Sequence, residues 1–130
     1  MTAGQTATYA GVITSTINQP GVIFTTSTAI ILSLTVGADG VSLFGPASAT
    51  VTTQNNFDNI PMTQTSTSGS LSGHLLAPNS TAVNLSFVLN FPSGAQPGTT
   101  IGFLGSELFA GQTDSATSGE TNLFTLQRVG

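Results

Sequence analysis

Apolar and polar residues alternate along most of this 130-residue chain, and the alternation restricts the fold more than any other feature of the sequence. Successive side chains of a β-strand point to opposite faces, so a period of two indicates half-buried strands, whereas helices repeat every three to four residues. In residues 81–91 every second residue is large and apolar: Val83, Leu85, Phe87, Leu89 and Phe91. We therefore expect a strand there, with Leu85, Phe87 and Leu89 almost fully buried.

Other short segments have the same character, and none has the helical period. They are residues 6–16, 21–26, 28–36, 41–44, 47–53, 70–76, 99–104 and 122–129. The step Asp39-Gly40 predicts a tight hairpin, because both residue types tolerate positive φ. Residues 54–68 and 110–121 are polar and longer than tight turns need, so we interpret them as solvated loops, with contact surfaces as the alternative.

Eight or nine short strands separated by Gly, Pro, Asn and Ser predict an all-β fold. The pattern is typical of a single-domain antiparallel β-sandwich, jelly-roll-like, with a small β-barrel as the alternative. Residues 1–130 form one domain that is long enough to bury a core without disulfides. Residues 1–17 are a candidate strand-exchanging N-terminal segment, although pairing within their own sheet is the favoured interpretation.

Charge is scarce in this chain, and its scarcity excludes several classes of partner. There is one arginine, Arg128, and no lysine, and charged residues make up 5% of the chain, where about 25% is usual. Without a basic patch, neither nucleic acid nor an anionic membrane surface is expected as a partner. No apolar run approaches the roughly 20 residues of a membrane helix, so membrane insertion is not expected either.

The candidate chemical sites are weak, and we predict no enzyme activity, no metal and no cofactor. Gly69-Ser70-Leu71-Ser72-Gly73 looks like a nucleophile elbow, but Leu71 occupies the central position. His74 follows within a predicted strand and is expected at the surface. We expect Asp39, Asp58 and Asp114 in three separate turns, without the spacing of a calcium loop. The absence of cysteine excludes disulfides and thiolate metal sites.

Two sequons, Asn79-Ser80-Thr81 and Asn84-Leu85-Ser86, make Asn79 and Asn84 candidate glycosylation sites in a secreted protein. Binding to surface glycans is also conceivable for a β-sandwich. Sugar sites usually stack their ligand on Trp or Tyr, however, and this chain has no Trp and only Tyr9.

The sequence favours a non-enzymatic, self-assembling structural subunit of an extracellular filament or appendage, such as a pilus, or of a virion surface. Few charges mean little desolvation cost when copies pack together. The expected partners are other copies of the chain, and the expected location is extracellular, on a cell surface or on a virion. The alternative is a carbohydrate-binding, lectin-like module.

Overall fold

The computed structural model describes residues 2–57, 60–115 and 121–130, and these residues form nine β-strands and no helix. The strands are β1 Thr6–Gln19, β2 Val22–Val36, β3 Ser42–Asn55, β4 Met62–Thr65, β5 Ser68–Leu75, β6 Ala82–Phe91, β7 Gly94–Leu104, β8 Leu108–Ser115 and β9 Thr121–Arg128. The all-β prediction is confirmed for the described residues. The predicted loop 54–68 is wrong at β4, although residues 56–57, 60–61 and 66–67 are not in strands. The predicted loop 110–121 is wrong at residues 110–115, which belong to β8, and its residues 116–120 lie outside the described residues.

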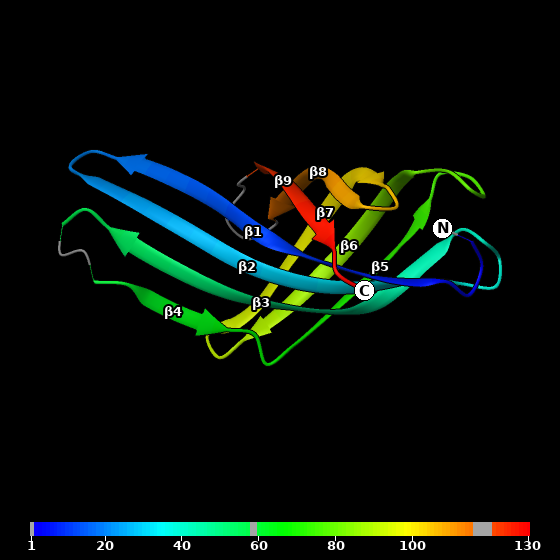
Figure 1. The fold of residues 1–130 in the computed structure, drawn as a ribbon. Coiled ribbons are helices and arrows are strands. Elements are labelled where there is room, and N and C mark those ends of the chain that lie inside the picture. Colours follow the sequence, from blue (N-terminus) through cyan, green and yellow to red (C-terminus); the bar gives the residue numbers. More distant parts are fainter. Residues whose placement is uncertain (1, 58–59, 116–120) are drawn as a thin grey trace.

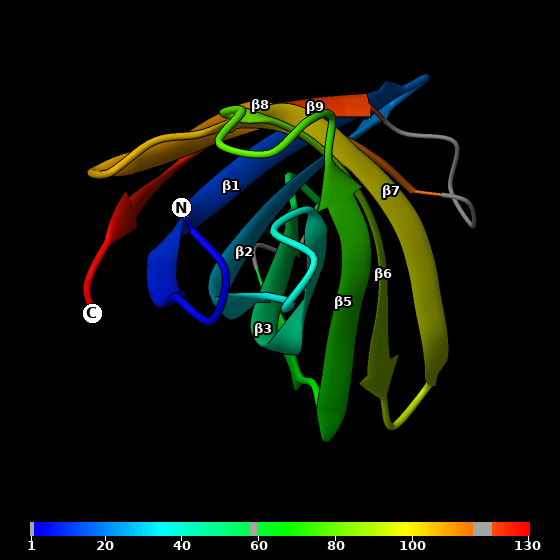
Figure 2. The same cartoon turned by 90° about the vertical axis from the view of Figure 1, so that its right-hand side faces the viewer.

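Eight strands close into an antiparallel β-barrel, in the order β2-β1-β9-β8-β7-β6-β5-β3, with β3 pairing back to β2. The short strand β4 pairs with the second half of β3. The barrel was the alternative to the expected β-sandwich. Figure 2 shows the strands curving around a common axis. The sandwich and the barrel bury the same face of each strand, which is why alternation alone did not separate them.

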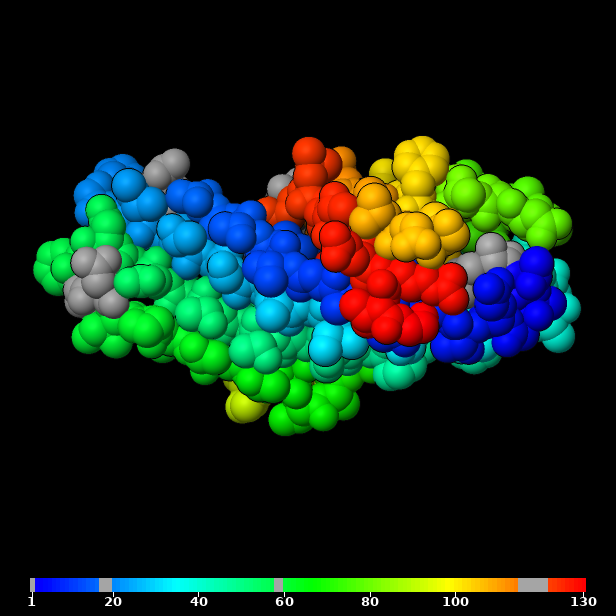
Figure 3. Space-filling model, in the orientation of Figure 1, coloured from blue at the N-terminus to red at the C-terminus, as the bar shows by residue number. Residues whose placement is uncertain are grey.

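The two ladders that close the barrel both lie at one end of the molecule. Strand β3 pairs with β5 over Ser42 to Pro46, and β1 pairs with β9 only at Tyr9 and Ala10. Beyond these seams, β1 to β3 continue together with β4 as an arm that projects from the barrel (Figure 1). Residues 11–19 of β1 alone give this arm a length of about 30 Å. The space-filling view shows the same arm extending from the rest of the molecule (Figure 3).

The core occupies the closed end, where apolar side chains of the strands meet. Tyr9 is fully buried there, and its hydroxyl donates a hydrogen bond of 2.8 Å to the carbonyl oxygen of Gly105. Its ring packs edge-on against Phe109, which in turn packs edge-on against Phe124, with centroid distances of 5.9 Å and 5.0 Å. This aromatic chain links β1, β8 and β9, so it stabilises the seam on which barrel closure depends.

Strand β6 confirms the expected facing, with one correction. Leu85 and Leu89 are 1% and 7% exposed, as predicted, but Phe87 is only partly buried. Phe87 points inward like its neighbours and packs against the core, but its ring also borders an internal cavity. The alternation therefore predicted the direction of the Phe87 side chain correctly, but its degree of burial incorrectly.

Glycines at inward positions let neighbouring strands bend sharply and approach closely. At Gly45 in β3, an added Cβ would lie 1.7 Å from the carbonyl oxygen of Ser33, so no side chain fits without moving backbone. Gly102 and Gly111 face each other across β7 and β8, and an added Cβ at either position would also clash with backbone atoms. A strongly curved sheet needs such positions, because curvature brings inward side chains and backbones together.

The N-terminal segment forms β1 within its own chain. It pairs with β2 along its whole length, from Thr6 with Thr35 to Gln19 with Val22. It also contributes Ala7 and Tyr9 to the core. Pairing within the chain was the favoured interpretation for residues 1–17, and exchange of the segment between copies stays a prediction.

Candidate ligand cavity

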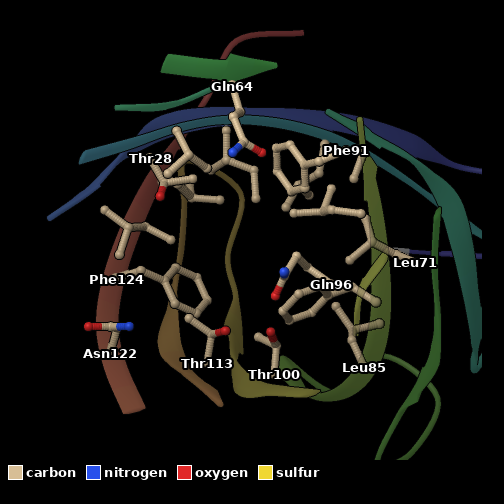
Figure 4. Close-up of a pocket in the computed structure, with 18 of the residues that line it drawn as sticks. Thr28, Gln64, Leu71, Leu85, Phe91, Gln96, Thr100, Thr113, Asn122 and Phe124 are labelled. Carbon is tan, nitrogen blue, oxygen red and sulfur yellow. The ribbon is translucent and has the colours of Figure 1, made fainter. Parts of the chain in front are cut away.

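A cavity of about 510 Å³ opens inside the molecule, between the arm and the sheet formed by β5 to β9 (Figure 4). Twenty-two of the described residues line it, and of these fourteen are apolar and none carries a charge. The remaining eight are neutral and polar: Thr28, Thr53, Gln64, Ser93, Gln96, Thr100, Thr113 and Asn122. The interior thus offers a hydrocarbon surface with a few hydrogen-bonding groups, which is the usual composition of small-molecule sites.

The register of the strands explains which residues meet in the cavity. On the arm, Ile13, Thr28, Val51 and Gln64 are successive cross-strand partners in β1 to β4, so they form one row across the wall. On the opposite wall, the corresponding row runs from β6 to β9. Its members are Leu85, Thr100, Thr113 and Asn122.

The cavity exists because β7 and β8 place small or polar residues at inward positions. The inward face of β7 reads Gln96, Gly98, Thr100, Gly102 and Leu104, and that of β8 includes Gly111 and Thr113. These side chains fill far less volume than the Leu and Phe residues of β6. An eight-stranded barrel has an interior that is either filled by side chains or holds one small ligand, so the missing volume remains as space.

Thr100 is the most enclosed polar residue of the cavity, at 6% exposure. Within the described part of the chain, its side chain makes no hydrogen bond, and no buried side-chain oxygen or nitrogen is sealed off without a partner. The Thr100 hydroxyl is therefore in contact with the cavity. In Figure 4 the side chains of Thr100, Thr113 and Gln96 point toward the same part of this space.

One hydrogen bond spans the rim of the cavity. The Ser93 hydroxyl, in the turn between β6 and β7, donates to the side-chain carbonyl oxygen of Gln64 in β4 at 2.9 Å. The bond connects the arm to the opposite sheet. Strand β4 thus adds a side wall to the cavity, on which Gln64 and Met62 lie beside the opening.

The charged residues that the structure describes are not among those that line the cavity. Asp39 is in the β2–β3 turn, where the Ser42 hydroxyl, and then the backbone N–H groups of Ser42 and Val41, lower the pKa of its carboxyl to about 2. Arg128 lies near the chain end, with its Nε 3.2 Å from the carbonyl oxygen of Gly130. Burial raises the pKa of Tyr9, and the charge of Arg128 opposes that rise. No charge on these residues is placed to meet an ionised ligand.

The residues singled out from the sequence do not gather at the cavity. Asn79 and Asn84 are exposed, Asn79 in a turn with φ of +63° and Asn84 on the outer face of β6, and their glycosylation stays a prediction. His74 is exposed on β5 beside Asn84. Asp58 lies outside the described residues. Within residues 2–57, 60–115 and 121–130, no three His, Cys, Asp or Glu side chains lie close enough to hold a metal ion, and no helix could cross a membrane.

A second concave surface lies on the outside of the barrel, over β6 to β9. We call it the outer groove, and its apolar members that are not buried are Leu76, Ala82, Ile101, Phe103, Ala110 and Leu123. Phe103 and Leu123 are 66% and 81% exposed. Large apolar side chains that gather on an exposed surface commonly mark a site of contact with another molecule.

No protein-family model, curated protein or solved structure matches this chain. The assignment of a role therefore depends on the barrel, its cavity and its outer groove. Sequence reasoning missed the cavity, although one signal was present. The inward positions of residues 96–104 hold Gln, Gly, Thr and Gly, which interrupts the pattern of large apolar residues.

Proposed function

We propose that this protein binds a small, predominantly apolar molecule inside its barrel and catalyses no reaction. The internal cavity of about 510 Å³ carries this proposal, because its size and its mixture of apolar walls and few polar groups match small-molecule sites. Binding would remove the apolar surface of the ligand from water, which is the main favourable term for such complexes.

The test is the binding of a neutral fluorescent apolar probe, N-phenyl-1-naphthylamine, to the full-length protein. We expect saturable binding of one probe per chain. The variant Val51→Trp places a large ring in the cavity from the arm wall, and we expect it to weaken probe binding about tenfold or more, equivalent to about 1.4 kcal/mol.

Ser48→Trp is the matched control, because Ser48 lies on the same strand but points outward. It should leave probe binding unchanged. Probe binding that does not saturate, or that both variants alter equally, would show that the cavity is not the binding site.

Self-assembly is the second candidate function, as a structural subunit of an extracellular filament, pilus or virion surface. The outer groove supports it, since Phe103 and Leu123 expose most of their apolar surface there. The scarcity of charge supports it as well. Carbohydrate binding has less support, because Tyr9, the only Tyr or Trp, is fully buried and is not available to stack on a sugar.

A further inference from the structure

The polar groups of the cavity restrict the chemistry of its ligand, on the premise that the cavity binds a small molecule as proposed above. Thr100 is the informative residue, because a hydroxyl in an enclosed site loses its hydrogen bonds to bulk water. Thr100 is 6% exposed, and its hydroxyl makes no hydrogen bond within the described residues. A ligand that carries a hydrogen-bond donor or acceptor would supply a partner for this hydroxyl.

Two further groups share this space with Thr100. Thr113 is its cross-strand partner on β8, and Gln96 lies four residues earlier on β7, on the same inward face. Figure 4 shows the three side chains directed toward a common region. Two hydroxyls and one amide can each donate and accept a hydrogen bond, so they suit a hydroxyl or carbonyl group on the ligand.

The lining also argues against an ionised ligand. None of the described residues that line the cavity carries a charge, and the single arginine of the chain lies near its C-terminus, where Nη1 is 3.5 Å from the carbonyl oxygen of Ser106. A carboxylate or ammonium group brought into this cavity would lose its hydration without gaining an opposite charge, which is strongly unfavourable.

The remaining surface of the cavity is hydrocarbon. Phe87, Phe91, Phe109 and Phe124 contribute aromatic rings, and Leu and Ile side chains from both walls complete it. A ligand that satisfies both parts of the lining has an extended apolar body and one uncharged polar group.

We infer that the cavity takes an uncharged, hydrocarbon-rich molecule bearing a hydroxyl or carbonyl group, and that Thr100, Thr113 and Gln96 bind that group. The inference distinguishes such ligands from fatty acids, which have the same hydrocarbon body with a carboxylate. It also distinguishes them from plain hydrocarbons, which leave the three polar side chains without a partner.

The experiment is competition against N-phenyl-1-naphthylamine on the full-length protein at neutral pH, with decanol, decanoate and decane as matched competitors. We expect decanol to displace the probe at a concentration at least about tenfold lower than decanoate. Thr100→Val keeps the shape of the side chain and removes the hydroxyl. It should weaken decanol binding about three- to tenfold more than it weakens binding of the probe, which carries no hydroxyl or carbonyl group.

Thr99→Val is the control, because Thr99 is the neighbouring residue on β7 and points to the outside. Thr113→Val provides the same test if Thr100→Val does not fold. Equal competition by decanol and decanoate, or equal decanol affinity of Thr100→Val and Thr99→Val, would overturn the inference while probe binding still supported a ligand cavity. Failure of the probe itself to bind would overturn the proposed function, and the inference with it.

Discussion

Leu85 and Phe87 are two residues apart on the same face of β6, yet their surroundings differ. Both line the cavity, but Leu85 is 1% exposed and belongs to the buried core, whereas Phe87 is partly exposed. The energetic cost of truncating a buried side chain has two parts, the lost burial of apolar atoms and the empty space that is left behind. Both parts are smaller for a side chain that is already partly exposed.

We therefore expect Leu85→Ala to cost more stability than Phe87→Ala, although phenylalanine is the larger side chain. The expected losses in the free energy of unfolding are about 2–5 kcal/mol for Leu85→Ala and about 1–2 kcal/mol for Phe87→Ala. Urea unfolding followed by circular dichroism measures both. A larger loss for Phe87→Ala would mean that its ring is packed as tightly as the core.

The β2–β3 hairpin shows how one element is determined by a few local contacts. The Asp39 carboxylate accepts hydrogen bonds from the backbone N–H groups of Val41 and Ser42 at 3.0 Å and 2.8 Å, and from the Ser42 hydroxyl at 2.5 Å. Gly40 has a φ of +77°, which glycine adopts without strain. The predicted Asp39-Gly40 hairpin is confirmed, because the interactions that form it lie within four residues.

These hydrogen bonds give the hairpin a dependence on pH. The Ser42 hydroxyl, and then the backbone N–H groups, lower the pKa of Asp39 from 3.8 to about 2 in the folded protein. A carboxyl with a depressed folded pKa stabilises the fold above its unfolded pKa, and the stabilisation is lost as the pH falls through its folded pKa. We expect the free energy of unfolding to decrease between pH of about 4 and about 2.

Asp39→Asn should flatten that decrease, because asparagine does not titrate, and Ser42→Ala should reduce it in part. Urea unfolding at several pH values measures the slope, and the ¹³C chemical shift of the Asp39 carboxyl measures its pKa directly. An unchanged slope in Asp39→Asn would assign the acid sensitivity to another carboxyl.

At the scale of the whole molecule, the barrel hides one apolar surface in its cavity and leaves another exposed in the outer groove. A standard protein interface buries about 800 Å² on each partner, so an interface between copies would extend beyond the groove over the strands around it. Asn84 also lines the groove, so a glycan on that residue would block contacts there.

If copies associate through the outer groove, Phe103→Ser and Leu123→Ser should shift the protein toward the monomer. Multi-angle light scattering over a range of concentrations measures the shift. Phe57→Ser is the control, because Phe57 is an exposed aromatic residue outside the groove. A strictly monomeric parent protein at high concentration would remove the main support for self-assembly.

Deleting the N-terminal segment would not test self-assembly. Strand β1 forms a wall of the barrel and contributes Tyr9 to the core, so its removal would open the fold of each chain. Point substitutions in the outer groove leave the barrel intact and address association alone.

The sequence by itself determined the strands, their facing and the turn at Asp39. Each of these depends on residues near one another in the chain: alternation sets the face of β6, and side-chain hydrogen bonds set the turn. The sequence did not predict β8, because Ala110, Gly111 and Gln112 lack clear alternation. This segment is a strand because it pairs with β7 and β9. The sequence also did not predict β4, which is held by β3.

Only the tertiary structure decided that the sheet closes, and therefore that a cavity exists. Closure depends on β1 meeting β9, which joins Tyr9 to Arg128 across almost the whole chain. No local pattern encodes a pairing between residues so far apart, because the same inward faces would also pack as two sheets. Thr100, Thr113 and Gln96 share one face of β7 and β8, and only that closure brings the arm over them.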